Sequence, residues 1–295
     1  MTLDTMLNSR TAARLAALLA LPLLLLAACS GDDNATGKLK LAITDAPVDG
    51  ATAVVVQFTG VEVQGAGGRH DFDFDPPRQV DLLALQGGAS TPILDKVTLP
   101  AGHYEWIRLK VDAVADNVFD SFITLDDGTQ HELDVPSGAE TGLKLVGGFN
   151  VPAGGTADFT VDFDLRKSVH LPMSAGSPYV LRPTLRLVDN VRVGAIAGVV
   201  DVSLITSGCT PAVYVFEGAG VTPDDIDGAA PDPVTTAAVQ GNNGYDAAFL
   251  MPGDYTVAFT CDAAADDPGK SDAITFPSAK NATVTAGHTT TVNFP

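Results

Sequence analysis

This sequence has few of the residues from which catalytic centres are built. It contains five histidines, three cysteines and one tryptophan among 295 residues. The histidines show no metal-ligand spacing, and His131-Glu132 lacks the second histidine of a zinc-protease helix. No Gly-x-Ser-x-Gly elbow, phosphate-binding loop or dinucleotide fingerprint occurs. We therefore expect a protein that is not an enzyme and has no cofactor.

Basic side chains are also scarce. Lysine and arginine together number 17 against 36 acidic residues, which gives a net charge of −19. Residues 1–28 hold two arginines and one aspartate, so the chain without them carries −20. Such a surface repels nucleic-acid phosphates and acidic lipid headgroups. We expect no nucleic-acid partner.

The N-terminal segment predicts the location of the protein. Arg10 and Arg14 precede an apolar run at 15–26, and Ala-Ala-Cys follows at 27–29. A basic start, a short apolar segment and small residues at the exit are typical of a secretory signal, and the run is too short to span a membrane. Cys29 directly after Leu-Ala-Ala resembles the bacterial lipoprotein signal, which implies lipidation of Cys29. Ser30 resembles the outer-membrane sorting preference.

Beyond residue 37 the helical period is nearly absent, and one helical turn is expected at 80–85. Period-two alternation marks strands at 38–43, 53–63, 104–114, 157–165 and 179–188. With 29 glycines and 19 prolines, the pattern favours an all-β protein with frequent turns. About seven further short strands follow a boundary near 189–194, at 195–205, 212–216, 235–240, 245–250, 255–261, 273–276 and, as a single run, 282–294.

We therefore predict two tandem antiparallel β-sandwich domains, immunoglobulin-like or transthyretin-like, behind a lipoprotein signal peptide. The predicted parts are the signal peptide at 1–28, a lipidated tether at 29–37, a first sandwich at 38–190 and a second at 191–295.

Two family resemblances support this division. Leu-Ala-Ile-Thr-Asp-Ala-Pro-Val-Asp at 41–49, Leu-Pro-Ala-Gly-His-Tyr at 99–104, Asp-Phe-Asp-Leu-Arg-Lys-Ser-Val at 162–169 and Tyr-Val-Leu-Arg-Pro at 179–183 resemble a bacterial lipoprotein family called domain of unknown function 4382. The resemblance spans about 38–190, implies a β-sandwich and assigns no activity. Gly-Val-Val-Asp at 198–201, Gly-Tyr-Asp-Ala at 244–247 and Met-Pro-Gly-Asp-Tyr-Thr-Val at 251–257 resemble the carboxypeptidase-regulatory-like, transthyretin-like sandwich over about 192–295.

If Cys29 is lipidated, Cys209 and Cys261 remain as a pair in an oxidising compartment. Cys209 opens one predicted strand and Cys261 closes another, an arrangement that antiparallel neighbours bring together. We expect a disulfide between them, and two buried free thiols remain the alternative.

The alternation also predicts charged outer faces on the first sandwich. Asp162 and Asp164 point away from Val161 and Phe163. Like charges on neighbouring strands repel, so we expect basic side chains opposite these two aspartates. The candidates are Arg108, Lys110, Arg182 and Arg186.

Two acidic runs are weak candidates for calcium ligands, because calcium takes six to eight oxygen ligands. They contain Asp71, Asp73 and Asp75 in the first run and Asp224, Asp225 and Asp227 in the second. Neither run has the spacing of an EF-hand. Solvated acids in turns are the alternative, and we commit to no metal site.

Trp106 is a weak ligand candidate, since it points away from the apolar face of its strand beside Arg108. An exposed aromatic ring stacks on sugars or anchors a protein partner. Cover by a loop or the neighbouring domain is the alternative. Asp45 and Asp49 are expected to bond to the backbone of the turn between them.

Together these features predict a non-enzymatic lipoprotein of the cell envelope that binds or scaffolds at the outer membrane, facing the periplasm or the cell surface. Its expected partners are the membrane, through the lipid anchor, and an envelope protein or glycan. A glycan-binding accessory module and a calcium-stabilised adhesion module are the alternatives.

Overall fold

The computed structural model describes residues 35–136, 138–172, 174 and 177–295. The predicted signal peptide, Cys29 and the tether up to residue 34 lie outside the described residues. In the described part no helix has the length and hydropathy to cross a lipid bilayer. Residues Thr36–Pro295 form one compact unit.

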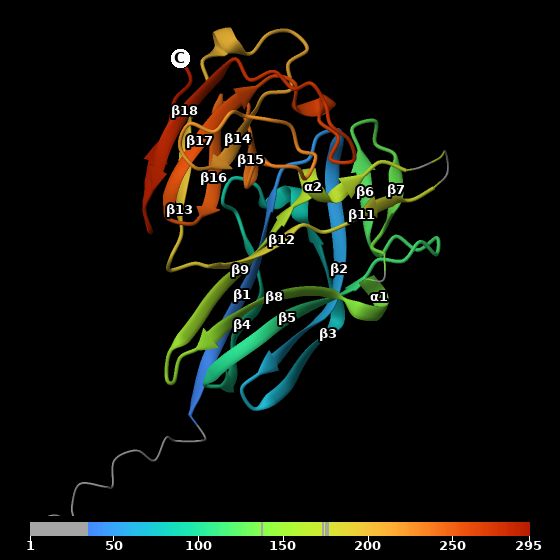
Figure 1. The fold of residues 1–295 in the computed structure, drawn as a ribbon. Coiled ribbons are helices and arrows are strands. Elements are labelled where there is room, and N and C mark those ends of the chain that lie inside the picture. The colour runs from blue at the N-terminus through green and yellow to red at the C-terminus, as the bar shows by residue number, and fades with distance from the viewer. Residues whose placement is uncertain (1–34, 137, 173, 175–176) are drawn as a thin grey trace, which may run out of the picture. The chain divides into compact units, whose positions relative to one another are not determined.

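The first sandwich packs a four-stranded sheet against an eight-stranded one (Figure 1). The smaller sheet has the order β12-β9-β1-β4, and the larger has β10-β11-β7-β6-β2-β5-β8 with β3 paired to β2. The strands are β1 (Thr36–Ala46), β2 (Ala51–Gly65), β3 (Gly68–Asp81), β4 (Thr91–Pro100), β5 (Gly102–Asp112), β6 (Phe122–Leu125), β7 (Gln130–Asp134), β8 (Leu143–Val151), β9 (Thr156–Asp164), β10 (Val169–His170), β11 (Tyr179–Leu181) and β12 (Leu185–Asp189). The short helices are α1 (Gly138–Thr141), α2 (Leu165–Ser168) and the predicted turn at Leu82–Leu85.

Alternation places the core of this sandwich as predicted. Leu39, Leu41 and Ile43 of β1 are fully buried, as are Ile107 and Leu109 of β5. Each set lies on one face of its strand because successive side chains point to opposite faces. The apolar faces of the two sheets meet in a single cluster.

The single strand predicted at 179–188 is wrong. The chain forms β11 in the larger sheet and β12 in the smaller one, with residues 182–184 between them. Pro183 has no N–H to donate to a ladder, so the strand ends before it. The move between sheets also explains why Val180 and Val188 depart from a common alternation.

The second sandwich has its own core and begins at residue 194. All of residues 191–295 are described, and they form β13 (Gly194–Val199), β14 (Ala212–Glu217), β15 (Thr235–Ala238), β16 (Gly244–Leu250), β17 (Gly253–Thr260), β18 (Ser278–Val284) and β19 (Thr289–Thr291). The sheet orders are β16-β13-β19 and β15-β14-β17-β18. Single 3₁₀ turns lie at Val202–Leu204 and Ala263–Ala265.

The predicted number of about seven strands is confirmed, but not all of the predicted strands are correct, and the one predicted at 195–205 ends at Val199. Residues 273–276 lie outside the strands, and the predicted strand 282–294 is divided between β18 and β19. The Cys209–Cys261 disulfide is confirmed, with 4.6 Å between the two Cα atoms. It joins the start of β14 to the end of β17, since Ala212 is paired with Thr260 in an antiparallel ladder.

Three strand pairs are parallel, namely β1 with β9, β7 with β11 and β13 with β19. The β1–β9 pair positions the candidate site. Its register aligns Asp45 with Phe163 and Ala46 with Asp164, so the two strands end side by side.

Candidate functional site

Three aspartates meet where β1 and β9 end together. Asp45, Asp162 and Asp164 are each only 6% exposed. The expectation that Asp162 and Asp164 belong to a charged outer face is therefore wrong. The reason is that β15 of the second sandwich covers this end of the sheet, where Thr235 and Thr236 line the same pocket as Asp45 and Asp162.

Burial sets the protonation of these acids. It raises the pKa of Asp164 to about 6, and it raises the pKa of Asp45 well above its usual range, with the charges of Asp162 and Asp164 adding to that rise. Asp45 accepts one hydrogen bond from the Leu165 N–H at 3.2 Å, and Asp164 accepts one from the Lys167 N–H at 3.2 Å. The second oxygen of each carboxyl has no hydrogen-bond partner among the described residues. These two carboxyl groups are thus well suited to holding a proton.

Asp162 has the basic neighbour that the alternation predicts. Arg186 is aligned with Asp162 across the β9–β12 ladder and forms an ion pair with it. Burial still raises the pKa of Asp162 above its usual value, because Arg186 offsets the desolvation only in part. The same expectation is wrong for Asp164, which lies opposite Ala46 at the end of the ladder.

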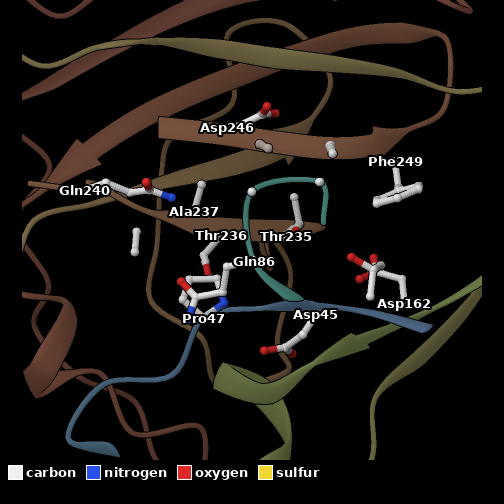
Figure 2. A pocket seen from close by; sticks show the side chains of 16 residues that line it. Asp45, Pro47, Gln86, Asp162, Thr235, Thr236, Ala237, Gln240, Asp246 and Phe249 are labelled. Carbon is white, nitrogen blue, oxygen red and sulfur yellow. The ribbon is translucent and has the colours of Figure 1, made fainter. Parts of the chain in front are cut away.

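The pocket beside these acids is small and polar. Figure 2 shows Asp45 and Asp162 of the first sandwich and Asp246 of the second around it. Its volume is about 20 Å³, which suits one water molecule. One oxygen of Asp246 is buried without a hydrogen-bond partner among the described residues, and burial raises the pKa of this residue. At this volume the pocket admits a water molecule and is too small for an organic ligand.

Arg166 joins the two sandwiches next to this pocket. It follows β9 in α2 and is 3% exposed. Its guanidinium forms an ion pair with Asp49, donates from Nε to the Thr236 hydroxyl at 3.2 Å and donates from Nη1 to the Ala263 carbonyl at 2.9 Å. The neighbouring Lys167 pairs with Asp232. Asp49 therefore binds Arg166, and the predicted turn role does not account for its main contact.

Arg166 also lines a cleft of about 230 Å³. Its apolar wall includes Ile123, Leu125, Val169, Leu171 and Tyr179, and its polar wall includes Asp49, Arg166, Asp266 and Asp267. Nη2 of Arg166 is buried and has no hydrogen-bond partner in the described part of the chain. The guanidinium of Arg166 and the three carboxyl groups thus give the cleft a charged wall beside its apolar one.

The first acidic run is neutralised by a lysine. Lys110 Nζ lies 2.7 Å from Asp71 and 2.8 Å from Asp73, and the hydrogen bond from Lys110 lowers the pKa of Asp71. Asp75 is exposed beyond them. The structure thus places Lys110 where a calcium ion would have to lie.

The three aspartates of the second acidic run, at 224, 225 and 227, lie in different surroundings. Asp224 is exposed, and Asp227 accepts a hydrogen bond from the Ala229 N–H at 2.7 Å within its own turn. Asp225 instead is 1% exposed and lies close to Asp266 and Asp272. The sequence pattern did not identify Asp266 and Asp272 as candidate calcium ligands.

Trp106 is half-buried on β5. The Arg108 guanidinium lies 5.0 Å and the Lys144 ammonium 4.5 Å from its ring centre. Side-chain cations thus contact the ring, and neither the cover by a loop nor the open platform for a sugar describes this site well.

Sequence reasoning also missed Arg166, which donates hydrogen bonds to Thr236 and Ala263 of the second sandwich. A detectable signal was present, since Asp-Leu-Arg-Lys directly follows an alternating strand in a chain with few basic residues. Its partners come from distant segments, and no local pattern identifies them.

The solved structures that match this chain are distant from it. The match to the Bacillus anthracis TIE protein has 13% sequence identity and a TM-score of 0.22. It covers 88% of this chain and 33% of the TIE chain. The match to a putative carbohydrate binding protein from Pseudomonas aeruginosa has 18% sequence identity and a TM-score of 0.24. It covers 36% of this chain and 90% of the Pseudomonas chain. The match to the minor pilin of Streptococcus agalactiae has 11% sequence identity and a TM-score of 0.22. It covers 86% of this chain and 94% of the pilin chain. The chain spans about a third of the length of the Bacillus protein.

These scores are too low to bear on function. A search of curated proteins found no sequence match. A family model does match residues 36–183, which is half of the chain and contains Asp45, Asp49, Asp164 and Arg166. The chain belongs to the family described as "Domain of unknown function (DUF4382)".

Proposed function

We propose that this chain is a non-enzymatic binding module of the bacterial cell envelope, held to the outer membrane by acyl chains on Cys29. Its ligand site is the cleft beside Arg166, and a glycan end is the ligand we favour. Scaffolding of an envelope protein through the same cleft is the broader form of this role.

The observation that carries the proposal is an amphipathic cleft whose lining combines apolar side chains with Arg166 and three aspartates. Ligand pockets combine apolar walls with a few placed polar groups, and the cleft volume of about 230 Å³ lies just below the common range of about 300–1,000 Å³. A sugar ring presents one apolar face and several hydroxyls, which match Tyr179 and Leu171 on one wall and Arg166 with Asp267 on the other.

A glycan array tests this ligand class. Leu171 is 66% exposed at the cleft, so Leu171→Ser removes an apolar contact and leaves the core intact. Loss of about 1.5 kcal/mol of apolar contact predicts about tenfold weaker binding. Val146→Ser is the matched control, because Val146 is 77% exposed on β8 and does not line the cleft. Uniform silence of the wild-type protein, or equal loss in both variants, would count against the proposal.

The lipid anchor is supported by the Leu-Ala-Ala-Cys pattern at 26–29 and by the charge of the chain. A net charge of −19 does not hold a protein to acidic headgroups, whereas each buried acyl methylene contributes about 0.8 kcal/mol. Wild-type protein is expected to incorporate labelled palmitate and to stay with membranes at high salt. Cys29→Ala is expected to do neither, and retention of this variant on membranes would exclude the anchor.

A further inference from the structure

Two long segments of the second sandwich are joined by acidic side chains. Residues 218–234 connect β14 to β15, and residues 261–277 connect β17 to β18. The Ile226 N–H of the first segment donates to Asp266 of the second at 3.1 Å. In the opposite sense, the Asp272 N–H donates to the carboxylate of Asp225. Carboxylates thus hold these segments together where strand pairing is lacking.

Three of these carboxylates converge. Asp225, Asp266 and Asp272 each place an oxygen within 4.8 Å of the other two. Asp225 is 1% exposed, and its Oδ1 is buried with no hydrogen-bond partner among the residues that the structure describes. A buried carboxylate oxygen without a donor needs a cation or a proton to offset its desolvation.

Two basic side chains of the described residues act on this cluster. Lys270 Nζ lies 3.4 Å from Asp272, and the Lys270 side chain is 58% exposed. The charge of Arg166 acts on Asp266, and Arg166 also forms an ion pair with Asp49. Burial raises the pKa of Asp266, and the nearby charge of Asp225 adds to that rise. The carboxylates therefore repel one another across a common centre.

We propose that Asp225, Asp266 and Asp272 bind a calcium ion that joins segments 218–234 and 261–277. Calcium bonds to oxygen at about 2.3–2.6 Å, so two of its ligands lie at most about 5 Å apart, which fits the 4.8 Å spread of the cluster. Calcium also accepts irregular geometry and fills its six to eight positions with backbone carbonyls and water. Magnesium needs a tighter octahedron at about 2.0–2.1 Å, so it fits this spread less well.

Terbium luminescence tests this site directly in the full chain. The Tyr214 hydroxyl donates to Asp266 at 2.5 Å, so its phenol lies next to the proposed ion and sensitises bound Tb³⁺. After treatment with EDTA, one Tb³⁺ per chain is expected to bind and to be displaced by Ca²⁺. The melting temperature is expected to rise by about 3–5 °C at calcium concentrations about tenfold above Kd. Equal responses to Mg²⁺ and Ca²⁺ would overturn the calcium assignment.

Asp225→Asn is the critical variant, because it keeps a carbonyl oxygen for the Asp272 N–H and removes the charge. We expect at least about tenfold weaker calcium binding, the scale of losing about 1.4 kcal/mol. Asp227→Asn is the matched control in the same segment, since Asp227 lies outside the cluster. Calcium affinities that are equal in the two variants would overturn the site.

The wild-type titration decides the outcome even where Asp225→Asn fails to fold. No Tb³⁺ signal and no calcium-dependent shift up to about 10 mM, above the range of about 10⁻⁴–10⁻³ M for extracellular modules, would overturn the proposal. Tyr214→Phe is expected to weaken the luminescence and to keep the calcium-dependent rise in melting temperature. All readings are made without glycan, so they do not depend on the cleft ligand.

Discussion

Arg166 of the first sandwich donates a hydrogen bond to the Ala263 carbonyl of the second at 2.9 Å. The same guanidinium binds Asp49 and Thr236, so one buried side chain connects three segments. Breaking a buried charged pair leaves its partners unsatisfied.

We predict that Arg166→Met destabilises the protein by about 3 kcal/mol, the lower end of the range for such pairs, because Asp49 keeps some contact with water. Urea unfolding measures the change. Lys40→Met is the control, since its ion pair with Asp158 keeps about a third of each side chain in contact with water and is worth about 0–1 kcal/mol. Equal effects of both variants would mean that Arg166 does not stabilise the junction.

The buried acids predict that stability falls with pH. The pKa of Asp164 is about 6 in the folded protein and 3.8 in the unfolded protein. Between these two pH values the folded protein therefore binds more protons than the unfolded protein. The contribution of Asp164 is therefore fully present below pH about 4 and decreases by up to about 3 kcal/mol as the pH rises through 6. The raised pKa values of Asp45 and Asp162 act in the same direction.

Asp164→Asn is expected to match the wild type near pH 4 and to exceed it in unfolding free energy at pH 7, by up to about 3 kcal/mol. Urea titrations across this range give the comparison. Asp95→Asn, an exposed site on β4, is expected to retain the wild-type profile. A deficit of Asp164→Asn at pH 7 would show that the carboxylate is stabilising.

The disulfide closes a loop of 52 residues. Removing it by the double substitution Cys209→Ala and Cys261→Ala is predicted to cost about 4 kcal/mol in the chain-entropy model. Dithiothreitol should lower the urea midpoint of the wild type and leave that of the double variant unchanged. A wild-type midpoint that does not respond to reductant would contradict the estimate.

Contact between Lys144 and the Trp106 ring predicts a coupling of about 0.5–1 kcal/mol between these side chains. A double-mutant cycle with Trp106→Ala and Lys144→Met measures it by urea unfolding. A coupling near zero would mean that the ring is free to take another partner.

Local patterns predicted those features that depend on neighbouring strands. The disulfide follows from strand ends in an antiparallel pair, and the Asp162–Arg186 pair follows from alternation and like-charge repulsion. The family motifs at 41–49 and 162–169 contain junction residues, but they assign these residues no role. The break at Pro183 was also detectable, since proline cannot donate to a ladder.

Tertiary cover explains what the patterns missed. Alternation placed Asp162 and Asp164 on one face, but β15, which buries that face, lies about seventy residues further along the chain. Asp225 and Asp272 are likewise 47 positions apart, and their contact depends on how two irregular segments pack. The period of the apolar residues and the spacing of motifs do not predict contacts between segments that lie far apart in the sequence.

The position of β1 inside its sheet has a mechanical consequence. This strand begins the described unit at Thr36 and is hydrogen-bonded to β9 on one side and to β4 on the other. Tension applied at Thr36 along the strand loads both ladders in shear, so many hydrogen bonds must rupture together. Forced unfolding is governed by the unfolding rate, and we expect this end of the protein to resist pulling for far longer than a strand that peels from a sheet edge.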